Sequence, residues 1–212
     1  MGCDIHFFVE KKIGNKWVSV DEWKDYDGWK TVDYKKAFYS NRNYDLFAIL
    51  ANVRNGYGFA GCDTGNGFIP ISMPRGLPDN VSQEVGNHSK QYGEDGHSHS
   101  YLTVKELLAY DWNQTTKKRG VVSEEEYQEI IDKPKRYAGG VSGRDIVHVT
   151  PSQMDRLITH PELKDKDKSY YTTVEWKETY KEAVRDFYIE TLPRLKGLGK
   201  PNKVRIVFWF DN

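Results

Sequence analysis

Residues 204–210 read Val-Arg-Ile-Val-Phe-Trp-Phe, a run in which only Arg205 is polar. A short apolar run that is rich in β-branched and aromatic residues is typical of a strand buried on both of its faces. Such a strand lies inside a sheet rather than at its edge. The run therefore predicts the centre of a sheet, around which the other elements are placed.

Residues 3–10, Cys-Asp-Ile-His-Phe-Phe-Val-Glu, alternate between the two faces of an extended chain. One face carries the core candidates Cys3, Ile5, Phe7 and Val9, so the pattern predicts a first strand with one core face. A turn at residues 14–15 and a second run at 17–20 predict an antiparallel hairpin. Residues 21–39 are aromatic-rich and have no clear period, and we expect little regular structure there.

Residues typical of helix ends mark the expected helices. The start residues, each of which precedes a helical segment, are Asn43, Thr103, Ser123 and Thr150. The helix after Ser123 is expected to end near Lys133-Pro134. A long amphipathic helix is expected after Thr173, with a buried stripe formed by Tyr180, Val184, Phe187, Thr191 and Leu195.

These elements predict an α+β fold with a mixed or antiparallel sheet that includes the N- and C-terminal strands, and with helices packed on it. We expect a single domain over residues 1–212, with a loop-rich insertion at about 56–100. This insertion holds nine of the 18 glycines and three of the six histidines. Long loops inside a compact domain tend to bind ligands or carry active sites.

Charge and hydropathy exclude several classes of protein. The chain has 31 Lys and Arg against 31 Asp and Glu, so it lacks the positive field that grips duplex nucleic acid or an anionic membrane. No stretch approaches the roughly 18 consecutive apolar residues of a membrane span. The first residues lack the basic segment of a secretory signal, and we expect a cytoplasmic protein.

Asp4 and His6 share one face of the first strand. With His97 and His99 they are the candidate catalytic residues. A carboxylate beside an imidazole can orient the ring or share a metal ion with it. The alternative is a histidine at the edge of the core beside an exposed carboxylate. If the terminal strands are neighbours, Asp211 also lies beside this pair; otherwise it is a solvated end.

Residues 95–100 read Asp-Gly-His-Ser-His-Ser. Histidines at i and i+2 lie on one side of an extended segment, and imidazole suits zinc or manganese. The candidate metal ligands are Asp4, His6, Asp95, His97 and His99. The alternative is a polar loop whose histidines are solvated.

A glycine-rich run at 56–68 is followed by Arg75. Glycines let backbone N–H groups approach an anion, Arg can clamp a phosphate, and aromatic rings can stack on a base. The candidate ligand-binding residues are Arg54, Tyr57, Phe59, Asp63, Arg75, Ser98 and Ser100. The glycine spacing matches neither a P-loop nor a dinucleotide-binding turn, so a plain loop is the alternative.

Five segments together resemble a family of uncharacterised proteins of tailed bacteriophages and prophages whose sequences begin Met-Gly-Cys-Asp-Ile-His. They are residues 2–6, 42–47, 74–78, 95–102 and 204–212. The resemblance implies a phage-encoded accessory protein in the cytoplasm of the host cell. It implies no activity, catalytic residue or cofactor.

Three functions remain open at this point. The first is binding of a small nucleotide or nucleotide-derived ligand, with the purpose of countering host defence signalling. The second is a metal-dependent hydrolase, similar to a phosphodiesterase, which uses the Asp4/His6 and His97/His99 clusters. The third is a structural or host-protein interaction module. The expected partner is a small ligand, without duplex nucleic acid or membrane, and a homo-oligomer stays open.

Overall fold

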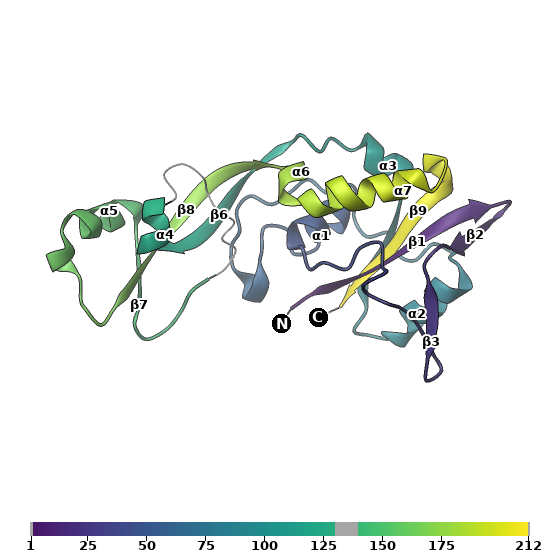
Figure 1. The fold of residues 1–212 in the computed structure, drawn as a ribbon, viewed down its shortest axis with the longest axis horizontal. Coiled ribbons are helices and arrows are strands. Elements are labelled where there is room, and N and C mark those ends of the chain that lie inside the picture. The colour runs from purple at the N-terminus through teal and green to yellow at the C-terminus, as the bar shows by residue number, and fades with distance from the viewer. Residues whose placement is uncertain (1, 130–139, 212) are drawn as a thin grey trace. The chain divides into compact units, whose positions relative to one another are not determined.

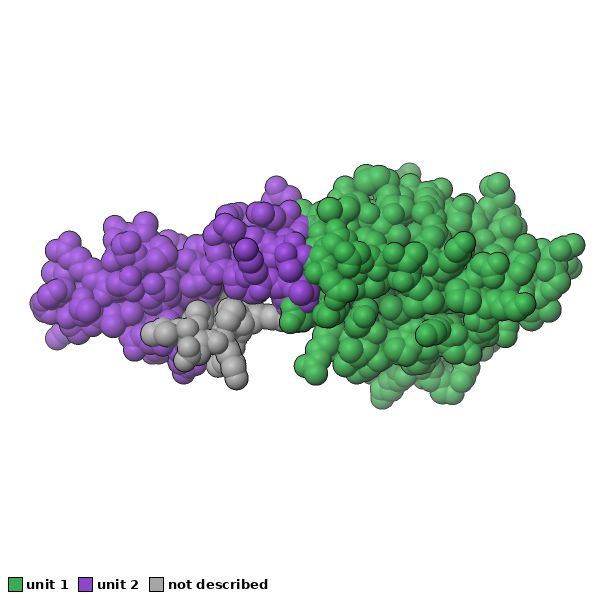
Figure 2. All heavy atoms as spheres, turned by 90° about the horizontal axis from the view of Figure 1, so that it is seen from above, with its two compact units in different colours: residues 1–55, 68–114, 180–212 green, residues 56–67, 115–179 purple. Residues whose placement is uncertain are grey.

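The computed structural model describes residues 2–129 and 140–211. The chain forms two compact units, which are coloured separately in Figure 2. Unit 1 comprises residues 1–55, 68–114 and 180–212, and unit 2 comprises residues 56–67 and 115–179. We expected one domain with an insertion at about 56–100. The long segment that interrupts unit 1 is instead 115–179, and most of 56–100 belongs to unit 1 itself.

Unit 1 is built on a four-stranded antiparallel sheet with the order β2-β1-β9-β5. Its strands are β1 (Asp4–Ile13), β2 (Lys16–Ser19), β5 (His97–Thr103) and β9 (Val204–Asp211). The predicted α+β class, the first hairpin and the central position of residues 204–210 are confirmed. The first and last strands therefore lie side by side (Figure 1), and the register pairs Asp4 with Asp211 and His6 with Trp209.

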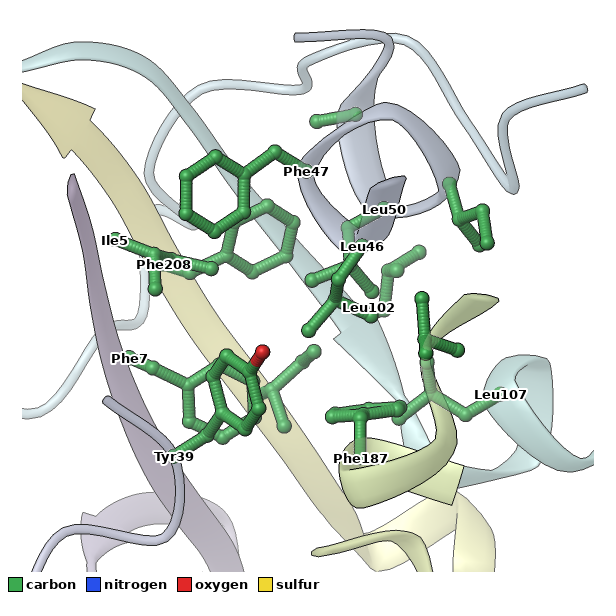
Figure 3. Close-up of a cluster of buried hydrophobic side chains, with 14 of the residues drawn as sticks. Ile5, Phe7, Tyr39, Leu46, Phe47, Leu50, Leu102, Leu107, Phe187 and Phe208 are labelled. Carbon is green, nitrogen blue, oxygen red and sulfur yellow. The ribbon is translucent and has the colours of Figure 1, made fainter. Parts of the chain in front are cut away.

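One side of this sheet, the core face, packs against helices. They are α1 (Tyr44–Ala51), α3 (Val104–Ala109), α6 (Tyr180–Ala183), the π-helix η3 (Phe187–Thr191) and α7 (Leu192–Gly197), and the 3-10 turn η4 (Pro201–Lys203) precedes β9. Figure 3 shows Phe47 of α1 beside Phe208 of β9 in this core. The cap at Asn43 is confirmed, because its side chain accepts a hydrogen bond from Leu46 N (3.2 Å).

The opposite side, the Trp209 face, has a smaller cluster made by Phe8, Val85, Val207 and Trp209. It is covered by the hairpin β3 (Trp23–Tyr26) and β4 (Trp29–Val32) and by α2 (Gln83–Gln91). We expected little structure at 21–39 and a long loop at 56–100, and the structure differs on both points. Strands β3 and β4 have only four residues each, and α2 has Val85 as its one aliphatic residue. Tertiary contacts such as Trp23 on Phe8 hold these elements (ring centroids 5.2 Å apart).

The helix expected after Thr173 begins later than predicted. Strand β8 (Ser169–Thr179) occupies its first part, and α6 starts at Tyr180. The segment at 170–174, Tyr-Tyr-Thr-Thr-Val, favours a strand because its residues are β-branched or aromatic. The predicted stripe is nevertheless buried, from Tyr180 to Leu195.

Unit 2 contains a second sheet with the order β6-β8-β7, in which β6 (Thr115–Ser123) is antiparallel and β7 (Ile146–Val149) is parallel to β8. Its helices are α4 (Glu124–Glu129), α5 (Pro151–Thr159) and the 3-10 turns η1 (Phe59–Gly61) and η2 (Pro161–Leu163). The helix starts expected at Ser123 and Thr150 are confirmed. The end expected at Lys133-Pro134 lies outside the described residues. Across the described chain, no helix has the length and apolar character that crossing a bilayer requires.

Candidate functional site

Trp209, fully buried, is the centre of an aromatic cluster on the Trp209 face of unit 1. The rings of His6 and His99 stack on its indole, with centroids 5.6 and 5.5 Å away and interplanar angles of 22° in both cases. Phe8, His88 and Tyr92 contact the same indole at 5.0, 6.0 and 5.9 Å. We call these six residues the Trp209 cluster. Three histidines from β1, α2 and β5 therefore surround one tryptophan.

A β-bulge in β5 decides which histidines reach this cluster. His97 pairs with Phe210 and Ser100 pairs with Phe208, so three steps along β5 match two steps along β9. Ser98 takes up the extra residue with a left-handed φ of 52°. His97 therefore lies on the core face beside Phe210, while His99 lies on the Trp209 face. The prediction that His97 and His99 point to one side is wrong, because the bulge reverses the alternation.

His6 is oriented by a carboxylate from the neighbouring strand. Its Nε2 donates to Oδ2 of Asp211 (3.1 Å), and the other oxygen of Asp211 accepts from the backbone N of Asp4 (3.2 Å). The expected proximity of Asp211 to Asp4 and His6 is confirmed, because β1 and β9 are neighbours. The carboxylate of Asp4 itself is held by Arg42, with Nε and Nη2 at 2.7 and 2.5 Å. This contact lowers the pKa of Asp4.

Burial lowers the pKa of both His88 and His99, so both rings are neutral at pH 7. Nδ1 of His88 lies 3.0 Å from the carbonyl of Lys30. A carbonyl only accepts, so Nδ1 carries the proton and Nε2 of the neutral ring is left as an acceptor. Nε2 of His99 hydrogen-bonds the hydroxyl of Ser89 (2.9 Å). Both rings are therefore fixed by hydrogen bonds that involve α2.

A pocket of about 240 Å³ lies against this cluster in unit 1. It is lined by residues 5–8 of β1, by His88 and Tyr92 on α2 or just after it, and by Thr31, Val32, Tyr34, Ala37, Tyr39 and Ser40. None of these twelve residues is Lys, Arg, Asp or Glu. We call it the His6–His88 pocket. It is an aromatic pocket with a few hydroxyl groups and without a formal charge.

The edge of β1 in this pocket is open. Strand β2 pairs with β1 at residues 10–13, so in the described chain no strand pairs with the same side of β1 at residues 4–8. Val9 accepts from Val20 N on that side (2.9 Å). Backbone groups of successive strand residues point to alternate sides, so the N–H and C=O groups of Ile5 and Phe7 point to that side as well. The pocket therefore contains backbone donors and acceptors beside aromatic rings.

The residues predicted to bind a ligand lie in both units. In unit 1, the guanidinium of Arg54 lies over the ring of Tyr44 (5.2 Å), and Nη2 of Arg75 pairs with Glu106 (2.7 Å). The hydroxyl of Ser98 bonds Nδ1 of His97 (3.0 Å), and Ser100 is buried and accepts from the backbone N of Arg75 (3.3 Å). Each of these four side chains is engaged within the protein.

Unit 2 holds the other three predicted residues. Tyr57 and Phe59 are more than half exposed, and Asp63 pairs with Arg119. The glycine-rich run has a structural explanation here. A Cβ on Gly65, which has a φ of +114°, would lie 2.1 Å from the carbonyl oxygen of Lys117. The glycine lets the loop bridge to β6, so this close approach is made to the protein's own backbone rather than to an anion.

The predicted metal ligands do not assemble. Among the residues that the structure describes, no group of three or more His, Cys, Asp or Glu side chains is arranged to hold a metal ion. Asp4 is bound to Arg42, the bulge separates His97 from His99, and Asp95 is exposed. The zinc or manganese site therefore has no preformed counterpart in these residues.

Sequence reasoning missed His88 and Tyr92 as site residues. Their spacing of four places both on one side of α2, and this pair of rings was the available signal. No sequence pattern indicated that residues 31–40 line the pocket, because this depends on where the β3–β4 hairpin packs. Comparison of the sequence with protein-family models and with curated proteins, and of the fold with solved structures, found no match.

Proposed function

We propose that this protein binds a small planar heteroaromatic ligand, a nucleobase or a nucleoside, in the His6–His88 pocket. The observation that supports it is the combination of an open strand edge with aromatic walls in one uncharged pocket. A nucleobase offers the matching features, because it has two stacking faces and an edge that carries both hydrogen-bond donors and acceptors.

The strand edge supplies recognition of the base edge. The N–H and C=O groups of Ile5 and Phe7 form an alternating row of donors and acceptors on the open side of β1. Such groups are obligatory hydrogen-bonding groups, and a buried one that stays unpaired costs free energy. A ligand in the pocket can therefore bond groups of β1 that no strand of the described chain pairs.

The rings supply stacking. His6 and Tyr92 lie 4.0 Å apart by their centroids, and both line the pocket together with Phe8 and His88. Stacking of a base on an aromatic side chain contributes about 1–3 kcal/mol. The volume of about 240 Å³ is below the roughly 300–1,000 Å³ of drug-sized pockets, so it suits one ring system rather than a peptide strand or a dinucleotide.

The pocket lining contains no Lys or Arg. This restricts the proposed ligand further than the sequence alone did. We expected Arg54 and Arg75 to clamp a phosphate, but both are engaged by other side chains, and neither lines the pocket. An uncharged base fits this environment better than a polyphosphate does. A metal-dependent hydrolase finds no support in the arrangement of the described side chains.

The biological setting of the proposal rests on the resemblance to phage proteins alone. It suggests a phage-encoded accessory protein that sequesters a nucleotide-derived ligand and so counters host defence signalling.

A thermal-shift screen of nucleobases, nucleosides and nucleotides tests the binding proposal. A ligand at 100 times its dissociation constant adds about 2.7 kcal/mol to the free energy of unfolding. Ala37→Phe adds a ring to the pocket wall, and we expect it to abolish the shift while the variant stays folded. The matched control is Tyr57→Phe in unit 2, which leaves the shift unchanged. If no base or nucleoside stabilises the wild-type protein, the proposal is wrong.

A further inference from the structure

A second pocket adjoins the first one at His88. It has a volume of about 290 Å³, and its walls are formed by α2 and by the start of β4. His88 lines both pockets, and two consecutive residues of β4 line one pocket each, Lys30 the second and Thr31 the first. The volume of the second pocket lies at the lower end of the roughly 300–1,000 Å³ that is typical of ligand pockets.

The second pocket is polar where the first is aromatic. Gln83, Asn87 and Gln91 follow each other at intervals of four residues, so their amides form one row along α2. Each amide both donates and accepts hydrogen bonds. Glu84 adds a carboxylate and Lys30 an ammonium group, so the formal charges of the lining cancel. Such a wall suits a group with several hydroxyls and no net charge.

We propose that this second pocket, the α2 amide pocket, binds the ribose of a nucleoside whose base occupies the His6–His88 pocket. The inference rests on the proposed function and names its ligand class: a nucleoside rather than a free base or a nucleoside triphosphate. Acidic side chains bind ribose hydroxyls in dinucleotide-binding proteins, and Glu84 offers the same chemistry here. One lysine beside one carboxylate does not compensate the charge of a triphosphate.

His88 is the residue that joins the two halves of the site. Its bond to the Lys30 carbonyl fixes the ring between α2 and β4, and the side chain of Gln91 interacts with the same imidazole. The ring is neutral, so its Nε2 is an acceptor. It is therefore a positioning residue, which holds the shared wall of the two pockets.

Calorimetric titration with a base, its nucleoside and its nucleoside triphosphate tests the inference. In the wild-type protein we expect the nucleoside to bind about tenfold tighter than the base, which corresponds to one or two net hydrogen bonds, and tighter than the triphosphate. Asn87→Ala combined with Glu84→Ala removes this advantage and leaves the affinity for the base unchanged. Lys90→Ala is the matched control, because Lys90 is exposed on α2 and lines neither pocket.

The outcomes separate the two proposals. A base and a nucleoside of equal affinity contradict the α2 amide pocket as a ribose site and leave the base site intact. Equal losses for base and nucleoside in the double variant also contradict it. If neither compound binds, the proposed function and this inference fall together.

Discussion

The two faces of the sheet in unit 1 are stabilised in different ways. The core face is an apolar contact between alternate residues of β1 and β9 and the helices, from Phe7 and Phe208 to Phe47. The Trp209 face combines aromatic rings with histidines, and it also holds the buried ion pair between Glu10 and Arg205. The same strands are therefore packed by apolar contacts alone on one side and by rings, histidines and a buried ion pair on the other.

Removal of the ion pair should have the largest effect on stability of the changes that act on the Trp209 face alone. Arg205 Nε donates to Glu10 Oε2 (2.6 Å), and Glu10 Oε1 accepts from the N–H of Ser82, the residue before α2. Glu10 is fully buried. Glu10→Ala leaves the guanidinium buried without its carboxylate, with only the two hydrogen bonds to Asn80. We therefore expect a loss of about 3–5 kcal/mol in the free energy of unfolding, measured with urea.

The control is a change of both partners. Replacing Glu10 by Gln and Arg205 by Met removes both charges, and it is expected to cost less than Glu10→Ala alone. A loss below about 1 kcal/mol in Glu10→Ala would show that the pair does not anchor the segment before α2.

The bulge is the next feature to break, because it assigns His97 and His99 to different faces. Ser98 has a φ of 52°, which a β-branched residue adopts poorly. We expect Ser98→Val to lower the free energy of unfolding by about 1–2 kcal/mol. Ser98→Gly, which tolerates this φ, should keep wild-type stability or exceed it. Equal stabilities of the Val and Gly variants would mean that the backbone at residue 98 is not left-handed in solution.

Mild acidification should produce the smallest effect. Burial holds the pKa values of His88 and His99 below the ordinary value, so their neutral forms stabilise the folded state. This contribution is complete above about pH 6.5, the pKa of an unfolded histidine, and is lost as the pH falls below it. Urea titrations at pH 7 and pH 5.5 measure it, and His99→Gln should show a smaller decrease than the wild-type protein.

Asp21 acts in the opposite direction and must be separated from the histidines. Burial raises its pKa to about 6, so the folded state binds this proton more tightly than the unfolded state does. Its contribution falls as the pH rises from about 4 to 6. The histidine effect is therefore best compared in an Asp21→Asn background. If the free energy of unfolding of Asp21→Asn with both histidines intact rises on acidification, the assignment of the effect to His88 and His99 is contradicted.

Local patterns predicted the elements whose burial follows a period. The alternation at residues 3–9 and the apolar run at 204–210 gave the central strands, and Asn43 and Thr150 gave correct helix starts. The β3–β4 hairpin and α2 were not predicted, because the residues that pack them on the sheet, such as the partly buried Trp23 and the buried Val85, depend on contacts with distant strands.

The candidate site was also predictable only in part. Asp211 could be placed beside His6 once the terminal strands were taken as neighbours, because the register follows from pairing. The opposite faces of His97 and His99 could not, because one extra residue in a bulge reverses the pattern without changing the composition. The contact of Gly65 with β6 could not be predicted either, because a glycine in the sequence is equally compatible with a binding loop and with a close approach to another backbone.

Strand β9, the last in the chain, lies between β1 and β5 in the sheet of unit 1. Its pairing with β1 joins residues up to 207 positions apart, as in the contact between Asp4 and Asp211. Bringing such distant residues together costs loop-closure entropy before any contact between them forms. The formation of this sheet is therefore intrinsically slow. A chain that lacks residues 204–211 would leave β1 and β5 with unpaired edges and the apolar residues of both faces exposed. We therefore expect truncated or slowly completed chains to aggregate through these strands until the final one is inserted.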